Sequence, residues 1–292
     1  MSNRLKYETL AVLLLCIALS CGKKNAPANS ITVSILPQKY FAERITGGLY
    51  KIFVMTPWGQ NPESYEPTLR QIGEISSSFI YFKAGYLPFE LTQMDRLRAA
   101  NPSIKIVDTS EGIELIKSDK AGGAHEHGGV DPHIWLSPKT AGAMALNMLN
   151  ALSAAVPERA SEFAKNYAAL EADIISASKK IEDSLKSATN KAFICFHPAW
   201  TYFARDYGLK QIAIESDGKE PSPSDIKKII DTAKKENIKT IFVQREFSAD
   251  IAQAIAKDIG GKTVQLDPLS ENWLEMMNSL SNTLAEELKT EK

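Results

Sequence analysis

The chain has 292 residues, of which 44% are hydrophobic and 24% are charged, and its formal net charge at pH 7 is -1. That length and composition are sufficient for a sizeable buried core. The near-zero charge argues against nucleic acid, or a membrane surface held by charge alone, as the partner.

The N-terminus predicts export. Arg4 and Lys6 precede the apolar run "LAVLLLCIAL", which is too short to span a bilayer and is typical of the central part of a signal peptide. The run ends in "ALSCG", where a bacterial lipoprotein signal would be cut and Cys21 acylated. We therefore predict a lipoprotein signal at 1–21, with an ordinary cleaved signal peptide as the alternative.

A flexible tether is predicted at 22–30, because the small and polar residues "GKKNAPANS" cannot form a core. Cys16 would leave with the signal and Cys21 would carry lipid, so Cys195 alone would remain a free thiol. No disulfide framework is expected, and stability must come from burial.

Short β-branched or aromatic runs recur along the chain, each followed by a longer amphipathic stretch. "SDIKKIIDTAKKENI" and "SADIAQAIAKDIG", for example, repeat apolar residues at spacings of three and four. Alternating strands and helices predict parallel sheets covered by helices. Four runs in each half predict two sheets, with strands at 31–36, 51–55, 79–82, 104–108, 192–196, 211–215, 240–244 and 263–267.

A long helix is predicted between the halves, at 157–188. Pro157 suits a first helical turn, and neither Gly nor Pro follows it in this stretch. Such a helix would extend about 48 Å, longer than one lobe needs, so we interpret it as a rigid link, which is compatible with a solvated charged outer face. The predicted fold is α/β, with lobes at 31–156 and 189–292, each built on a mostly parallel four-stranded sheet flanked by helices.

Three of the four histidines lie in one short stretch, "HEHGGVDPHIW", at 125–135. His125 and His127 belong to a loop, 117–130, with four glycines in fourteen residues, which predicts a mobile segment. His133 follows this loop and is preceded by Pro132, which restricts the backbone. The three histidines therefore need not form one site.

Candidate metal ligands fall at or beyond predicted strand ends, where ligands collect in open parallel sheets. A lone histidine is more often a residue with one structural hydrogen bond, but convergence at one edge would favour a ligand role. Two histidines and two carboxylates could hold a divalent metal. The candidates, two from each half, are Glu63, His133, His197 and Asp267.

These segments resemble the metal-binding solute-binding proteins of bacterial ABC importers, in particular the zinc-type subgroup. "GQNPESYEPT" matches the family pattern Gly-x-Asp-Pro-His-x-Tyr-Glu-Pro, "DPHIWLSP" its second histidine motif and "FHPAWTYFARDYGL" its third ligand motif, while "EPSPSDI" and "LDPL" complete the C-terminal lobe. The resemblance covers about residues 31–290. It implies the metal-receptor fold, with a rigid linking helix, and the ligands Glu63, His133, His197 and Asp267.

Glu63 departs from the family pattern, which usually has histidine there. A carboxylate adds negative charge and a harder ligand, so Mn²⁺ or Fe²⁺ becomes more competitive, although Zn²⁺ remains the first expectation. If Glu63 is not a ligand, His133, His197, Asp267 and water would form the site. Gln244 is a second departure, because relatives commonly carry glutamate; the sequence alone gives no interpretation of it.

The resemblance implies a function in metal transport. A periplasmic, membrane-anchored lipoprotein would capture a divalent transition metal and deliver it to an ABC transporter permease, as a monomer without enzymatic activity. His125 and His127 resemble a reduced form of the His-rich loop of zinc-type members, and they either collect metal weakly or are incidental. The alternatives are a metal-dependent adhesin or surface interaction protein and, less favoured, a metallo-hydrolase, which would need an open metal position and a general base.

Overall fold

The computed structural model describes residues 29–117, 129–186, 188, 190–215 and 220–288. The predicted signal with Cys21, and the loop histidines His125 and His127, lie outside the described residues. Within the described part, no helix is both long and apolar enough to cross a membrane.

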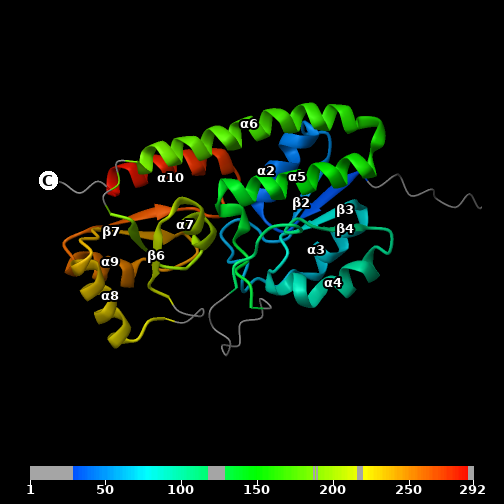
Figure 1. The fold of residues 1–292 in the computed structure, drawn as a ribbon. Coiled ribbons are helices and arrows are strands. Elements are labelled where there is room, and N and C mark those ends of the chain that lie inside the picture. The colour runs from blue at the N-terminus through cyan, green and yellow to red at the C-terminus, as the bar shows by residue number, and fades with distance from the viewer. Residues whose placement is uncertain (1–28, 118–128, 187, 189, 216–219, 289–292) are drawn as a thin grey trace, which may run out of the picture.

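Two parallel four-stranded sheets form the centres of two lobes (Figure 1). The strand orders are β2-β1-β3-β4 and β6-β5-β7-β8, so the two sheets repeat one topology. The prediction of two parallel sheets is confirmed. The strands are β1 Ser30–Val33, β2 Lys51–Val54, β3 Ser78–Lys83, β4 Lys105–Asp108, β5 Ala192–Cys195, β6 Lys210–Ala213, β7 Thr240–Gln244 and β8 Lys262–Leu266.

Helices cover both faces of each sheet. In Figure 1, α2 and α5 lie on one side of the N-terminal sheet and α3 and α4 on the other, while α8 and α9 lie below the C-terminal sheet. The helices are α2 Leu36–Thr46, α3 Leu69–Glu74, α4 Pro88–Ala100, α5 Pro138–Ala155, α6 Ala160–Leu185, α7 Thr201–Tyr207, α8 Pro223–Lys235, α9 Asp250–Asp258 and α10 Trp273–Glu287, with 3-10 turns at Ile75–Ser77, Ile134–Leu136 and Pro157–Arg159.

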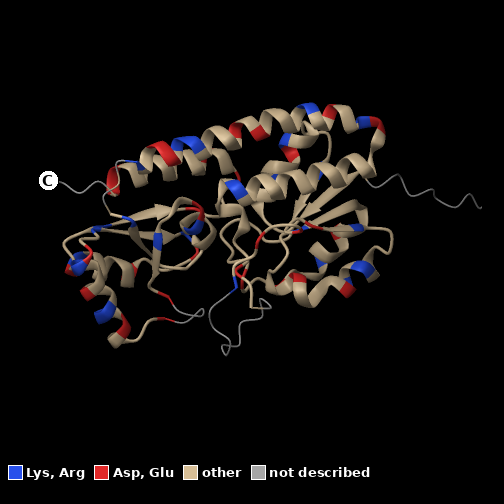
Figure 2. Ribbon diagram, in the orientation of Figure 1, with Lys and Arg blue, Asp and Glu red and all other residues tan. Residues whose placement is uncertain are grey.

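Helix α6 links the lobes, as predicted. It begins at Ala160, after the 3-10 turn at Pro157–Arg159, and its 26 residues extend about 39 Å. It packs against α2 and α5 of the N-terminal lobe and against α10 of the C-terminal lobe. Figure 2 shows Lys, Arg, Asp and Glu positions distributed along the α6 ribbon. Its buried side recurs at helical spacing, at Phe163, Tyr167, Leu170, Ile174, Ala177, Ile181 and Leu185.

Trp135 ties the two lobes together in a continuous buried core. Its indole Nε1 donates to the carbonyl of Pro268 at 2.8 Å, and its own carbonyl accepts from Nε1 of Trp273 at 2.7 Å. Both tryptophans are fully buried and belong to one hydrophobic cluster that includes side chains of both sheets. Separating the lobes would break both hydrogen bonds, each worth about 0.5–1.5 kcal/mol, and expose the apolar cluster to water.

Candidate metal centre

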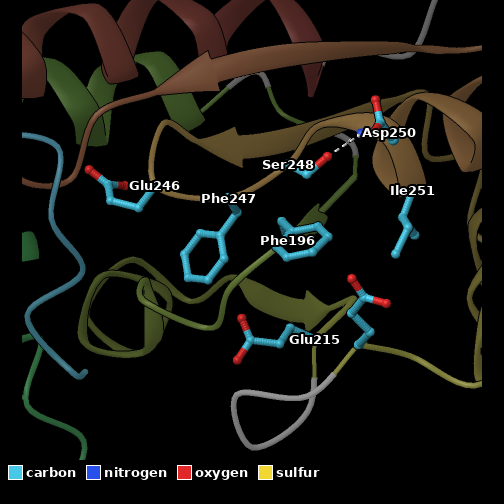
Figure 3. Close-up of a pocket in the computed structure, with 8 residues that line it drawn as sticks. Phe196, Glu215, Glu246, Phe247, Ser248, Asp250 and Ile251 are labelled. Carbon is cyan, nitrogen blue, oxygen red and sulfur yellow. Dashed lines mark hydrogen bonds between the residues drawn. The ribbon is translucent and has the colours of Figure 1, made fainter. Parts of the chain in front are cut away.

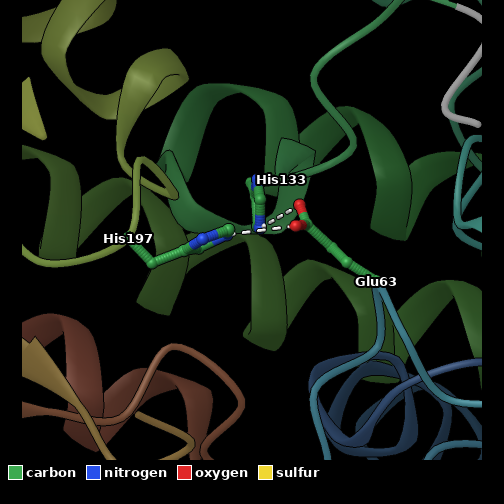
Figure 4. Close-up of side chains that lie close together, drawn as sticks. All are labelled: Glu63, His133 and His197. Atoms are coloured by element: carbon green, nitrogen blue, oxygen red, sulfur yellow. Dashed lines mark ion pairs between the residues drawn. The ribbon is translucent and has the colours of Figure 1, made fainter. Parts of the chain in front are cut away.

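Three side chains from separate parts of the chain meet at one point between the lobes. Glu63 Oε1 lies 3.4 Å from Nε2 of His133, and Glu63 Oε2 lies 3.4 Å from Nε2 of His197 (Figure 4). One ligand atom from each residue lies within 4.8 Å of the others. The two imidazoles are buried, with ring centroids 5.3 Å apart. We call Glu63, His133 and His197 together the metal cluster, meaning the three candidate ligands of one metal ion.

The topology places all three residues beyond the carboxyl ends of parallel strands. Glu63 lies in the loop between β2 and α3, His133 between β4 and α5, and His197 two residues after β5. Neighbouring strands run in the same direction, so loops leaving their ends gather at one edge of each sheet. The two edges face each other, because α6 and Trp135 fix the lobes.

One backbone motif recurs around the centre, in residues 61–63, 131–133 and 267–269. In each segment the side-chain oxygen of an initial Asn or Asp accepts the N–H of the third residue, at 2.9, 2.9 and 3.1 Å respectively. A proline between them restricts the backbone further. The third residue is a cluster member, Glu63 or His133, in the first two segments, so this turn fixes the direction of its side chain.

Both histidines have a carboxylate at the nitrogen that faces away from the cluster. Nδ1 of His133 lies 2.9 Å from Asp131 Oδ1, and Nδ1 of His197 lies 3.0 Å from Glu215 Oε2. A carboxylate at Nδ1 places the proton there and leaves Nε2 to act as a ligand. Phe247 also stacks on the His197 ring, at 5.0 Å between centroids and 18° between planes.

Neither carboxylate partner was among the predicted site residues, although signals for both exist. Asp131 stands two residues before His133, and Glu215 ends the predicted run 211–215. Glu215 thus has the same signal, a position at the end of a predicted strand, that indicates Asp267 as a candidate ligand. The sequence does not show that the two side chains pair, because His197 and Glu215 follow two neighbouring strands, β5 and β6, and are 18 residues apart.

The cluster fits a small divalent cation. Two atoms bound to a tetrahedral ion at about 2.1 Å lie about 3.4 Å apart. Each imidazole Nε2 is 3.4 Å from one oxygen of the Glu63 carboxylate, His133 from Oε1 and His197 from Oε2, and one ligand atom of each residue lies within 4.8 Å of the others. Beside the two imidazoles is a cavity of about 20 Å³, lined also by Trp135, Gln244 and Glu246. It has room for about one water-sized ligand, so three protein ligands and one further small ligand could complete a tetrahedral shell.

Asp267, the fourth predicted ligand, lies directly after β8 and is half-buried. Among the described residues, the group of atoms within 4.8 Å consists of the metal cluster without Asp267. Its Oδ1 accepts the N–H of Leu269, the same role that Asn61 and Asp131 have in their turns. The structure therefore brings together three of the four predicted ligands.

Further carboxylates gather at this end of the C-terminal lobe. A cavity of about 340 Å³ is lined by Glu215, Glu220, Glu246 and Asp250, together with Phe247 (Figure 3). Burial raises the pKa of Glu246, and the nearby charge of Asp267 raises it further. A concentration of negative charge favours cations over anions at the centre.

The carboxylates around His197 favour the protonated form of its imidazole in the metal-free centre. Burial alone would lower the pKa of its imidazole, but hydrogen bonds and charges of Glu215 and Glu63 outweigh burial and raise this pKa to about 10. The imidazolium then supplies positive charge beside the carboxylate that a cation would contact. Because a ligand imidazole must be neutral, a bound metal has to displace this proton.

We expect the metal-free protein to lose stability between about pH 6.5 and pH 10 because of His197. Folding raises the pKa of His197. Its contribution to the free energy of unfolding is therefore complete below the unfolded pKa of 6.5 and is lost as the pH rises through about 10. The contribution changes by at most about 1.4 kcal/mol per pH unit. The measurement is urea unfolding with a chelator from pH 6 to pH 10, comparing the wild type with His197→Gln.

Other groups titrate in the same range, so the difference between the two proteins is the informative quantity. That difference should shrink as the pH rises. Parallel pH profiles for the wild type and His197→Gln would contradict a protonated His197.

Comparison with known proteins gives the family. Residues 31–287 match the family model for the periplasmic zinc-uptake complex component A. The zinc-binding lipoprotein AdcA of Streptococcus pneumoniae is 29% identical over 269 residues, which cover 88% of this chain and 53% of AdcA. The chain thus spans about half the length of that relative.

Solved structures agree with this match. A crystal structure of ZnuA is similar with a TM-score of 0.83 and 36% identity, covering 88% of this chain and 98% of that one. The laminin-binding protein Lmb of Streptococcus agalactiae is a bifunctional protein with adhesin and metal transporting activity. Its structure is similar with a TM-score of 0.79 and 26% identity, covering 89% of this chain and 99% of that one. The resemblance found in the sequence is confirmed: the chain belongs to the ZnuA family, the periplasmic zinc-uptake component A.

Proposed function

We propose that this protein captures Zn²⁺ outside the cytoplasmic membrane and delivers it to the permease of an ABC transporter. The observation that carries the proposal is the metal cluster, in which one carboxylate lies 3.4 Å from the Nε2 atoms of two buried imidazoles. Its family consists of zinc-uptake components and not enzymes, so the metallo-hydrolase alternative is not retained.

The geometry favours Zn²⁺ over Mn²⁺ and Fe²⁺. Imidazole and carboxylate ligands in a four-coordinate arrangement suit zinc, whereas Mn²⁺ prefers six ligands that are mainly oxygen. The adjoining cavity of about 20 Å³ offers room for one more small ligand rather than three. The zinc-binding relative AdcA supports the same choice.

The proposed ligands are Glu63, His133, His197 and Asp267. Glu63 is supported by its contact with both imidazoles, and its Asx turn with Asn61 holds it in place. Asp267 is the proposed fourth ligand because it follows β8 at the same edge. A water molecule in the small cavity is the alternative fourth ligand, and the titration below distinguishes the two.

The rigid connection between the lobes limits how the bound metal could be released. Helix α6 and the indole hydrogen bonds of Trp135 and Trp273 span both lobes, so large hinge motion would break buried contacts. We propose that docking to the permease instead moves the 55–68 loop that carries Glu63. Removing one ligand this way would weaken the site without separating the lobes.

Zinc titration of ligand variants tests the site. We expect His133→Ala and His197→Ala to weaken Zn²⁺ binding by on the order of 100-fold or more. Losing the carboxylate that is hydrogen-bonded to a ligand histidine costs roughly 10- to 100-fold in affinity, and loss of the ligand itself should cost more. Glu63→Gln should lose less than the histidine variants, about 10- to 100-fold, because the amide oxygen can still face the metal while the negative charge is lost. Asp267→Asn should lose a similar amount if Asp267 is a ligand, and little if water takes its place. The measurement is competition with a chromophoric chelator, repeated with Mn²⁺.

The matched control replaces both loop histidines, His125 and His127, by alanine. We propose that this loop collects metal weakly, so the double variant should keep the tight site and lose only weaker additional binding. If His133→Ala bound both metals as tightly as the wild type, the proposed centre would be wrong. Loss of tight binding in the double variant would overturn the assignment of the loop.

We also propose a lipid anchor at Cys21. The relative named a lipoprotein and the periplasmic family support a location outside the cytoplasmic membrane, and the "ALSCG" sequence supports acylation. We expect Cys21→Ser to abolish metabolic labelling with a fatty-acid analogue and to release the protein from the membrane fraction. An unlabelled wild type would refute the anchor, and unchanged zinc affinity in Cys21→Ser would show that the centre is independent of it.

Surface interaction is the second candidate function, and its support is the likeness to Lmb, which has adhesin activity. If this chain has such a role, immobilised laminin should retain the zinc-loaded protein more than the metal-free protein. A solid-phase assay with both forms measures this. If the zinc-loaded and the metal-free protein were both retained only at background level, the proposed adhesin role would be wrong.

A further inference from the structure

A buried glutamine holds the backbone of one ligand. Gln244, the last residue of β7, is 2% exposed. Its Nε2 donates to the carbonyl of His197 at 2.8 Å, and its Oε1 accepts the N–H of His197 at 3.2 Å. One side chain therefore binds both polar groups of the residue that carries the imidazole.

These two bonds continue the sheet past the end of its backbone ladder. Cys195 pairs with Phe242 in the β5–β7 register, so two more residues would set His197 opposite Gln244. The last backbone bond between these segments runs from the Phe196 N–H to the Phe242 carbonyl, at 2.8 Å. Beyond it, the Gln244 amide supplies the donor and the acceptor that a strand backbone would otherwise offer.

The amide chemistry explains why glutamine suits this position. A primary amide offers a donor and an acceptor together, whereas an ionised glutamate of the same length offers acceptors alone. The His197 carbonyl, which also accepts from Ala199 N–H at 2.8 Å, would face a carboxylate without a donor. Glutamine also adds no charge to a centre that already contains Glu63, Asp131 and Glu215.

We propose that Gln244 is a positioning residue of the metal centre, acting through His197. Together with the Glu215 carboxylate at Nδ1 and the stacked Phe247 ring, it fixes the backbone, rotation and plane of one imidazole. Phe247 comes from the same turn, since its N–H donates to the Gln244 carbonyl at 3.3 Å. The inference rests on the proposed function, in which His197 ligates the metal.

Substitution of Gln244 tests this role by zinc affinity and by the visible absorption spectrum of the Co²⁺-loaded protein. We expect Gln244→Met, which removes both bonds at similar length, to weaken Zn²⁺ binding by about 10- to 100-fold and to shift the cobalt bands, because a partner of a ligand orients it. Gln244→Glu keeps the acceptor for the His197 N–H but sets a carboxylate against the His197 carbonyl, so it should also weaken Zn²⁺ binding.

Gln38 provides a matched control. It is fully buried, its Oε1 accepts the Ser34 N–H at 3.0 Å, and its Nε2 donates to Thr109 Oγ1 at 3.0 Å. Gln38→Met should lower the urea midpoint much as Gln244→Met does, while zinc affinity and the cobalt spectrum stay unchanged. Equal losses of affinity in both variants would mean general destabilisation and would overturn the proposal.

His197→Ala separates failure of this inference from failure of the proposed function. If His197→Ala loses zinc binding and Gln244→Met keeps the affinity and spectrum of the wild type, the positioning role is wrong and the metal site stands. If His197→Ala itself binds zinc as tightly as the wild type, the proposed metal centre is wrong.

Discussion

Two buried indole hydrogen bonds at Trp135 are the constraint on which the candidate metal centre depends. They join the segment that carries His133 to Pro268 and Trp273 of the other lobe, at 2.8 and 2.7 Å. The three residues of the cluster come from loops of both sheets, so their separations are meaningful only if the lobes are fixed. Helix α6, packed on α5 and α10, resists the same movement on the outer side.

Within that frame, electrostatics decides what the centre holds. Glu63 faces two imidazoles, and Asp131 and Glu215 face their opposite nitrogens. Burial opposes charge on His197, yet the carboxylates raise its pKa to about 10, so a proton supplies positive charge in the metal-free protein. At the proposed site a divalent cation would replace that charge and bind the two imidazole nitrogens, with no need for the lobes to move.

Much of the fold could be predicted because its signals are local. Strand runs such as 240–244 and the apolar spacing of α6 follow from backbone geometry and from burial of one face, which a short window records. The ligand candidates Glu63, His133 and His197 followed from strand-end position and family motifs. Glu215 and Gln244 escaped assignment, because their roles consist of contacts with His197 across the sheet.

The sequence by itself determined two parallel sheets, a linking helix and four candidate ligands, since periodicity and motif order are properties of the linear chain. Only the tertiary structure decided which candidates meet. Glu63 contacts both imidazoles, whereas the Asp267 Oδ1 is bound to the Leu269 N–H. The reason is physical: distances between side chains depend on strand register and lobe packing, and residues far apart in sequence acquire those distances only when the core is formed.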